Sequence, residues 1–81
     1  MQIVWDEPKR QANIAKHGYD FADLSPGFFL GAKVVQAKER RWMAIGRFSD
    51  GTIAVVFVTL GSEGLSVISM RAAGKKEREL L

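Results

Sequence analysis

The sequence predicts a single small α+β domain spanning residues 1–81. An N-terminal strand and two helices are expected to pack on a mostly antiparallel sheet of four to five strands, with a further helix at the C-terminal end. Three observations predict this fold. Signals for the start and end of helices follow one another between Asp6 and Gly31. Strand patterns separated by turn signals follow from residue 32. A chain of 81 residues has room for only one small hydrophobic core.

The first strand and helix are expected between residue 2 and Gly18. Residues 2–5, Gln-Ile-Val-Trp, are rich in residues that suit a pleated surface. Asp6-Glu7-Pro8 is a helix start, because aspartate caps the first N–H groups and proline is tolerated in the first turn. The helix should end near Lys16 or His17, because Gly18 suits the left-handed cap that follows a helix.

The second helical region is expected after Asp20, which predicts another cap. Its apolar residues have a spacing compatible with one helix face directed at the core: Phe21, Leu24 and Phe28. Pro26-Gly27 should shorten or bend this helix, and Gly31 marks the change to strands.

Four further strands are expected at residues 32–38, 41–48, 52–60 and 65–71. Ser49-Asp50-Gly51 is a hairpin turn signal, because Asp-Gly readily adopts positive φ. Residues 52–60 are apolar at both odd and even positions, which predicts a central strand covered on both faces. The charged tail, 74–81, has the composition of a short helix.

Strand alternation assigns side chains to faces of the expected sheet. One shared face is predicted for Arg41, Met43, Ile45 and Arg47. A second shared face is predicted along the last strand for Leu65, Val67, Ser69 and Arg71. An arginine that stands on a sheet presents a fixed fork for phosphate.

The basic excess is concentrated in the middle of the chain. The whole chain has 12 basic and 9 acidic residues, for a net charge of +3. Residues 32–50 alone have five basic and two acidic side chains. This surplus predicts an anionic partner for this segment. The alternative is that Lys38, Arg40 and Arg41 are solvated charges that discourage sheet edges from aggregating.

Composition excludes several classes of site. The chain has no cysteine and one histidine, so disulfides, zinc ribbons and thiol chemistry are excluded, and no cofactor or metal is expected. No apolar stretch approaches the roughly 20 residues of a membrane span, and the N-terminus does not resemble a signal peptide. A cytoplasmic location is therefore expected.

The remaining side chains suit RNA cleavage by the adjacent 2′-hydroxyl. That reaction needs a base, cations for the phosphate and an acid for the leaving oxygen. His17 is the natural proton-transfer candidate, although a histidine at a helix end can equally cap carbonyls, and Asn13 is expected to hydrogen-bond it. Glu39 could serve as base if buried beside Arg41. The tryptophans, Trp5 and Trp42, either stack a base or belong to the core.

An ordered set of residues along the chain resembles the BrnT family, ribonuclease toxins of bacterial type II toxin–antitoxin modules with a RelE-like fold. The resemblance is carried by Ile3-Val4-Trp5-Asp6, Lys9, Asn13, Lys16-His17-Gly18, Phe21, Phe29, Glu39, Arg41, Ile45-Gly46, Val55-Val56-Phe57, Ile68-Ser69, Arg71-Ala72 and Glu77. It covers nearly the whole chain, and its N-terminal part is the most specific.

The resemblance implies a metal-independent endoribonuclease that a BrnA-like antitoxin inhibits. Arg41 and Arg71 would clamp the phosphate, and His17 or Glu39 would transfer protons. RNA binding is expected from Lys16, Lys33, Lys38, Arg40 and Arg47. Operator DNA would be bound only through the antitoxin. No membrane partner is expected. A homodimer within the toxin–antitoxin complex is compatible with the resemblance.

Departures from the family pattern leave a second function open. Val58-Thr59-Leu60-Gly61 holds no arginine where the family usually has one after the central strand, and Ser66-Val67 replaces a usual basic residue. Loss of such cations weakens phosphate stabilisation. The alternative is a catalytically weak or inactive binding module that acts with its antitoxin as transcriptional co-repressor. A stand-alone nucleic-acid-binding domain ranks last, because no groove-reading helix is evident.

Overall fold

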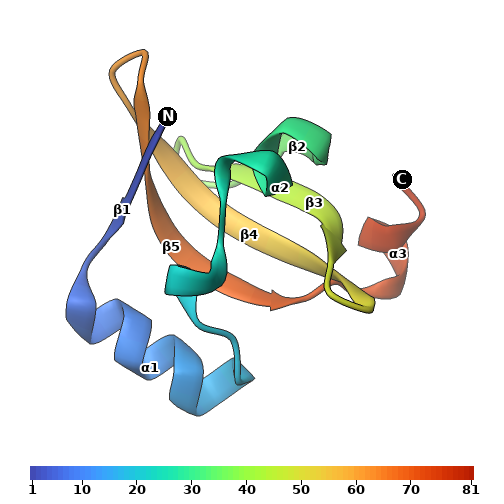
Figure 1. Cartoon of the computed structure of the whole chain (residues 1–81). Coiled ribbons are helices and arrows are strands. Elements are labelled where there is room, and N and C mark those ends of the chain that lie inside the picture. Colours follow the sequence, from blue (N-terminus) through green and yellow to red (C-terminus); the bar gives the residue numbers. More distant parts are fainter.

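The computed structural model describes all residues, 1–81. Its elements follow the predicted order (Figure 1): β1 (Gln2–Trp5), α1 (Glu7–His17), the 3-10 turn η1 (Phe21–Asp23), α2 (Pro26–Gly31), β2 (Lys33–Gln36), β3 (Trp42–Phe48), β4 (Gly51–Leu60), β5 (Gly64–Ala72) and α3 (Lys75–Arg78). The predicted α+β class is confirmed. No helix is both long and apolar enough to cross a membrane.

The five strands form one sheet in the order β1-β5-β4-β3-β2. Strands β2 to β5 are antiparallel neighbours joined by hairpins, whereas β1 adds to β5 in parallel. β4 is the central strand, as predicted from its apolar residues at both parities. Three consecutive residues of β4, Ile53, Ala54 and Val55, are fully buried, which requires cover on both faces of the sheet.

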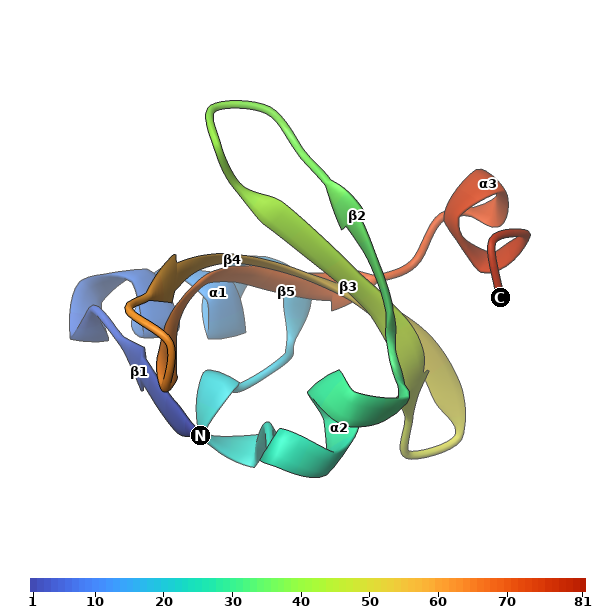
Figure 2. The ribbon, with the colours of Figure 1, turned by 90° about the horizontal axis from the view of Figure 1, so that it is seen from above.

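The main hydrophobic core lies between the sheet and the η1–α2 segment (Figure 2). Phe28 and Phe29 of α2 pack edge to face with each other, and Phe29 also meets Phe57 of β4. Gly46 of β3 allows this close approach, because a Cβ there would lie 3.2 Å from the Phe28 ring. Trp5 and Trp42 pack at the margin of the same core.

The second helical region is two short helices rather than one bent helix. The backbone is extended at Leu24 and Ser25, and α2 then begins at Pro26. Proline disfavours the helical conformation of the residue before it, so the Ser25–Pro26 step separates the two pieces. The predicted burial of the apolar residues on this region is confirmed.

Both predicted caps of α1 are present. The Asp6 side chain accepts a hydrogen bond from the Lys9 N–H, and Gly18 adopts φ 77°. After the helix, the Asp20 carboxylate accepts from the Ala22 N–H and from two nitrogens of Arg10, at 2.7 and 2.9 Å. These donors, the guanidinium above all, lower the pKa of Asp20 to about 2.

Asn13 joins α1 to the exposed edge of β5. Strand β1 pairs only with residues 64–67 of β5, so the rest of that edge has no strand neighbour. The Asn13 carboxamide replaces a neighbouring strand at this point of the edge. It accepts a hydrogen bond from the Met70 N–H at 3.1 Å and donates one to the Met70 carbonyl at 2.9 Å. It also donates to the Tyr19 carbonyl. The expectation that Asn13 bonds His17 is therefore wrong.

A bulge in β5 corrects the predicted face assignment of the last strand. Phe57 pairs with Val67, but the preceding residue, Val56, pairs with Ser69, so Ile68 is the extra residue. A bulge of one residue reverses the alternation of every side chain after it. Val67 is consequently buried in the core, whereas Ser69 and Arg71 lie on the opposite face.

Candidate functional site

The face of the sheet turned away from α2, here called the open face, has no helix layer over it (Figure 2). Strand register aligns Lys33, Ile45, Ala54 and Arg71 across β2, β3, β4 and β5. Ile45 and Ala54 are buried in a small cluster that Met43 and Val35 border. Residues opposite one another on antiparallel strands point to the same side, so this row places Lys33 and Arg71 on the open face.

The open face is cationic. Arg47 lies opposite Thr52 and shares its face with Met43 and Ile45, as predicted. Arg41 precedes β3, and its parity with Met43 assigns it to the same face. No strand of the sheet contains an aspartate or glutamate. Lys33, Arg41, Arg47 and Arg71 therefore form a ring of positive charge over the buried cluster of Ile45 and Ala54, and a ring of this kind attracts a polyanion.

Arg71 is held by a carboxylate from α3. Its Nη1 and Nη2 donate to the two oxygens of Glu77 at 2.7 and 2.8 Å, and Nη1 also donates to the Ala72 carbonyl. The Glu77 side chain is 20% exposed and also accepts from the Gly74 N–H. The arginine, with the Gly74 N–H, lowers the pKa of Glu77 to about 2. The bidentate fork of Arg71 is thus occupied in the free protein.

We expect the Arg71–Glu77 pair to make the fold sensitive to acid. The pKa of Glu77 is lower in the folded protein than its ordinary 4.5, so the pair contributes fully above about pH 5 and is lost as pH falls toward 2. Thermal unfolding between pH 7 and 2.5 should show a falling Tm over that range. Glu77→Gln should flatten the fall in Tm, whereas Glu79→Gln, at the residue that follows α3, should not.

His17 and Lys16 lie in a different groove, between α1 and the bulged edge of β5. This groove has a volume of about 210 Å³ and is lined by Lys9, Ala12, Asn13, Lys16, His17, Ile68 and Ser69. Its cations come from α1, whose Asn13 fixes the helix to β5. Ser69 belongs to the open face as well, so this groove opens beside the strand that carries Arg71.

Glu39 and Arg40 lie at the tip of the β2–β3 hairpin, together with Lys38. Arg41 approaches the Glu39 carboxylate at 3.9 Å, but the Glu39 side chain is 76% exposed, so the burial that a base role required is absent. Both central residues of the turn have positive φ, 61° for Glu39 and 62° for Arg40. A left-handed conformation costs an ordinary residue roughly 1–2 kcal/mol.

The sequence-predicted site residues therefore fall into three groups. The open face holds Lys33, Arg41, Arg47 and Arg71, the α1 groove holds Lys16 and His17, and the hairpin tip holds Lys38, Glu39 and Arg40. Sequence reasoning missed the role of Glu77. Its spacing from Gly74 is typical of a helix start, but nothing in the sequence indicated that it reaches Arg71.

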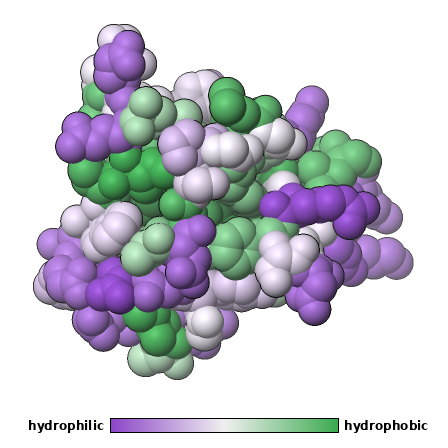
Figure 3. All heavy atoms as spheres, in the orientation of Figure 1, coloured by the Kyte–Doolittle hydropathy of each residue, from purple (hydrophilic) through white to green (hydrophobic).

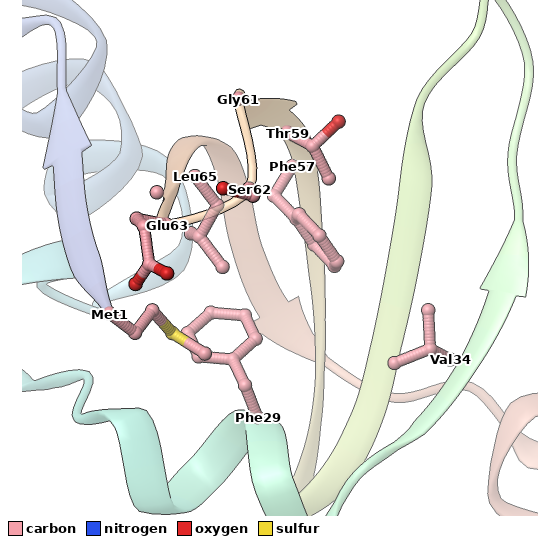
Figure 4. Close-up of a pocket in the computed structure, with 10 residues that line it drawn as sticks. Met1, Phe29, Val34, Phe57, Thr59, Gly61, Ser62, Glu63 and Leu65 are labelled. Carbon is pink, nitrogen blue, oxygen red and sulfur yellow. The ribbon is translucent and has the colours of Figure 1, made fainter.

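A groove lined mainly by apolar side chains is a separate feature of the molecule. Met1, Phe29, Val34, Phe57 and Leu65 line it, with Glu63 at its rim and a volume of about 330 Å³ (Figure 4). Figure 3 shows this side of the molecule, with apolar surface near the β4–β5 turn and hydrophilic side chains over α1. None of the predicted site residues lines this groove. No group of histidine, aspartate and glutamate side chains is placed to hold a metal ion.

Comparisons with known proteins agree with this picture of the chain. A family model described as the ribonuclease toxin, BrnT, of type II toxin–antitoxin systems matches residues 5–77. The 1.1 Å crystal structure of the Brucella abortus ribonuclease toxin, BrnT, is 63% identical to this chain and has a TM-score of 0.86. That match covers 93% of this chain and 99% of the other. A search of curated proteins finds no match. The predicted resemblance is confirmed, and the RelE-like description is consistent with the fold.

Proposed function

The chain belongs to the BrnT family of ribonuclease toxins of type II toxin–antitoxin systems, and on that premise we propose that it cleaves RNA on its open face by a metal-independent reaction. The observation that carries the proposal is the ring of Lys33, Arg41, Arg47 and Arg71 over the buried apolar cluster of that face. Such a ring attracts the phosphate backbone and supplies fixed positive charge where the reaction develops negative charge.

The proposed reaction uses a nucleophile that the substrate brings. The 2′-oxygen of one ribose attacks the adjacent phosphorus while its proton passes to a base. The bond from phosphorus to the 5′-oxygen breaks, and that oxygen takes a proton from an acid. The products are a 2′,3′-cyclic phosphate and a 5′-hydroxyl. Arg71 and Arg41 would stabilise the extra charge on the phosphate oxygens in the transition state.

Arg71 must change partners to bind phosphate in this way. Four of its N–H groups face Glu77, the Ala72 carbonyl and the Met43 sulfur, at 3.9 Å for the last. We propose that the scissile phosphate takes the place of Glu77, because carboxylate and phosphate present similar paired oxygens to a guanidinium fork. In the free protein Glu77 would then keep the guanidinium extended over the open face.

The proton-transfer residue is proposed to be His17 or Glu39. His17 lies in the α1 groove beside Ser69, and an imidazole can both accept and donate a proton. Glu39 lies near Arg41 at the hairpin, but its side chain is 76% exposed, so it would serve as a base only where bound RNA covers it. The RNA backbone would be held by cations of all three groups, namely Lys16, Lys33, Lys38, Arg40 and Arg47.

An end-group assay tests this function. The purified chain is incubated with single-stranded RNA in excess chelator, and the new ends are mapped. We expect cleavage that leaves 2′,3′-cyclic phosphate ends and that stops when the 2′-hydroxyl at the cut is methylated. Cleavage of fully 2′-O-methylated RNA, or cleavage only on adding a divalent metal, would refute the proposed reaction.

An antitoxin partner follows from the family, and we propose that it is BrnA-like and supplies all operator-DNA contacts of the complex. The complex, which would include a toxin homodimer, is proposed to form in the cytoplasm and to repress its own operon. Expression of this chain should arrest bacterial growth, and co-expression of the neighbouring open reading frame should restore it.

A second candidate function has its own support. The fork of Arg71 is already neutralised by Glu77, and the end of β4, from Val58 to Leu60, contributes no cation. A chain with this arrangement would act as a catalytically inactive co-repressor with its antitoxin. Operator binding by the complex, without growth arrest or RNA cleavage by the free chain, would favour this function.

A further inference from the structure

The β2–β3 hairpin ends in a turn whose residues do not suit its backbone. The hairpin rises from the sheet on the open side (Figure 2), and the Arg41 N–H donates to the Lys38 carbonyl across its tip. The two residues between them, Glu39 and Arg40, both have left-handed φ. Turns of this geometry strongly prefer Asn-Gly, so two charged residues occupy positions where they strain the chain.

Nothing inside the protein explains this choice of residues. Glu39 and Arg40 are exposed, and neither packs against the core. The only ion pair at the tip joins Glu39 to Arg41 at 3.9 Å and is too open to offset the strain. Strained residues of this kind concentrate at functional sites, where a partner requires the side chain.

A pocket lies directly against the strained tip. Its volume is about 450 Å³, and it is lined by Gln36, Ala37, Arg40, Arg41 and Trp42. Gln36 and Trp42 are register partners on β2 and β3, so they stand on the same side of the hairpin. Because Trp42 also pairs with Phe57 and packs at the margin of the main core, this side is opposite the open face. An indole, a carboxamide and two guanidinium groups together match the parts of a nucleotide: a flat base, a polar base edge and a phosphate.

We propose that this pocket is a nucleotide-binding subsite that takes one unpaired base of the RNA and its phosphate. The base stacks on the accessible part of Trp42, its edge hydrogen-bonds to the Gln36 carboxamide, and Arg40 contacts the phosphate. This inference rests on RNA as the substrate and adds a base-reading element that adjoins the cationic ring at Arg41. It also accounts for the turn, because glycine at position 40 would relieve the strain and remove the phosphate contact.

Trp42 fluorescence can report binding directly. Trp5→Phe leaves Trp42 as the only tryptophan and keeps an aromatic ring against Phe21. Short 2′-O-methyl RNA oligonucleotides of a single base type serve as probes, because they keep bases and phosphates but cannot be cut. We expect saturable quenching of Trp42 and an affinity that differs at least several-fold between base types. Quenching by an abasic oligonucleotide of equal length that matches that of RNA would overturn the proposal.

Variants at the tip separate this subsite from general charge attraction. Arg40→Gly should raise Tm by a few degrees and weaken RNA binding about tenfold, and Gln36→Ala should reduce the differences between base types. Lys76→Ala removes an exposed cation of α3, away from the tip, and should change binding less than Arg40→Gly. Equal losses for Arg40→Gly and Lys76→Ala, or an unchanged base preference in Gln36→Ala, would refute the subsite.

Cleavage mapping distinguishes failure of this subsite from failure of the proposed function. If Gln36→Ala still cuts RNA but chooses different positions, both proposals are supported. If it cuts at the parental positions at the parental rate, the subsite is wrong and the nuclease function stands. If the parent protein quenches base-selectively but never cuts RNA, the subsite stands and the nuclease function fails.

Discussion

Replacing Asn13 by alanine is expected to lower the free energy of unfolding by about 3 kcal/mol, since a buried polar group left unpaired costs about 1–3 kcal/mol. The Asn13 side chain is 6% exposed and satisfies both backbone groups of Met70, whose side chain is fully buried. Alanine would leave the Met70 N–H and carbonyl without partners where no strand covers the β5 edge. The packing of α1 against β5 would therefore be weakened.

Thermal and urea unfolding test this prediction. For a chain of this length we expect Tm to fall by more than about 10 °C. Asn13→Asp keeps the shape but would set a carboxylate oxygen against the Met70 and Tyr19 carbonyls, so it should destabilise at least as much as alanine. Gln11→Ala, on the exposed side of the same helix, should stay within about 0.5 kcal/mol of the parent. Equal stability of the Asn13 and Gln11 variants would contradict the account.

Replacing Arg71 by alanine is expected to reduce the rate of RNA cleavage by about 10²–10³-fold, the loss typical of one transition-state contact. Arg71 lies on the open face after the β5 bulge, in register with the row of residues that runs to Lys33. Arg71→Lys keeps the charge but loses the fork, so it should recover only part of the rate. Single-turnover kinetics measure both effects.

Glu77→Gln is the matched control for the Arg71 variants. It removes the competing carboxylate but keeps an acceptor for the Gly74 N–H, which Glu77 now binds at 2.8 Å. If phosphate replaces Glu77 on Arg71, this variant should bind uncleavable RNA more tightly than the parent. If Arg71→Ala and the parent cleave at equal rates, Arg71 has no part in catalysis and the proposed mechanism is wrong.

Most of the fold was predictable because its signals are local. The caps at Asp6 and Gly18, the hairpin at Ser49-Asp50-Gly51 and the apolar run of β4 each depend on a few neighbouring residues. The bulge at Ile68 was not predictable, since a bulge depends on the register of two strands far apart in sequence. It moved Ser69 and Arg71 to the opposite face from the core residues Leu65 and Val67.

The candidate site was predictable in composition more than in geometry. Charge counting identified the segment from Lys33 to Arg47, and strand parity placed Met43, Ile45 and Arg47 on one face. The sequence could not show that Glu77 folds back onto Arg71, because α3 follows a separate turn at Gly74. The sequence also could not show that Asn13 hydrogen-bonds to Met70 of β5 rather than to His17, because Asn13 and Met70 are 57 residues apart in the chain.

A structure of this protein bound to uncleavable RNA would show whether the phosphate meets Arg71. We predict RNA on the open face, a phosphate within hydrogen-bond distance of the Arg71 guanidinium, and Glu77 displaced from its present 2.7 Å contact. RNA bound elsewhere on the protein, with the Arg71–Glu77 pair intact, would contradict this prediction.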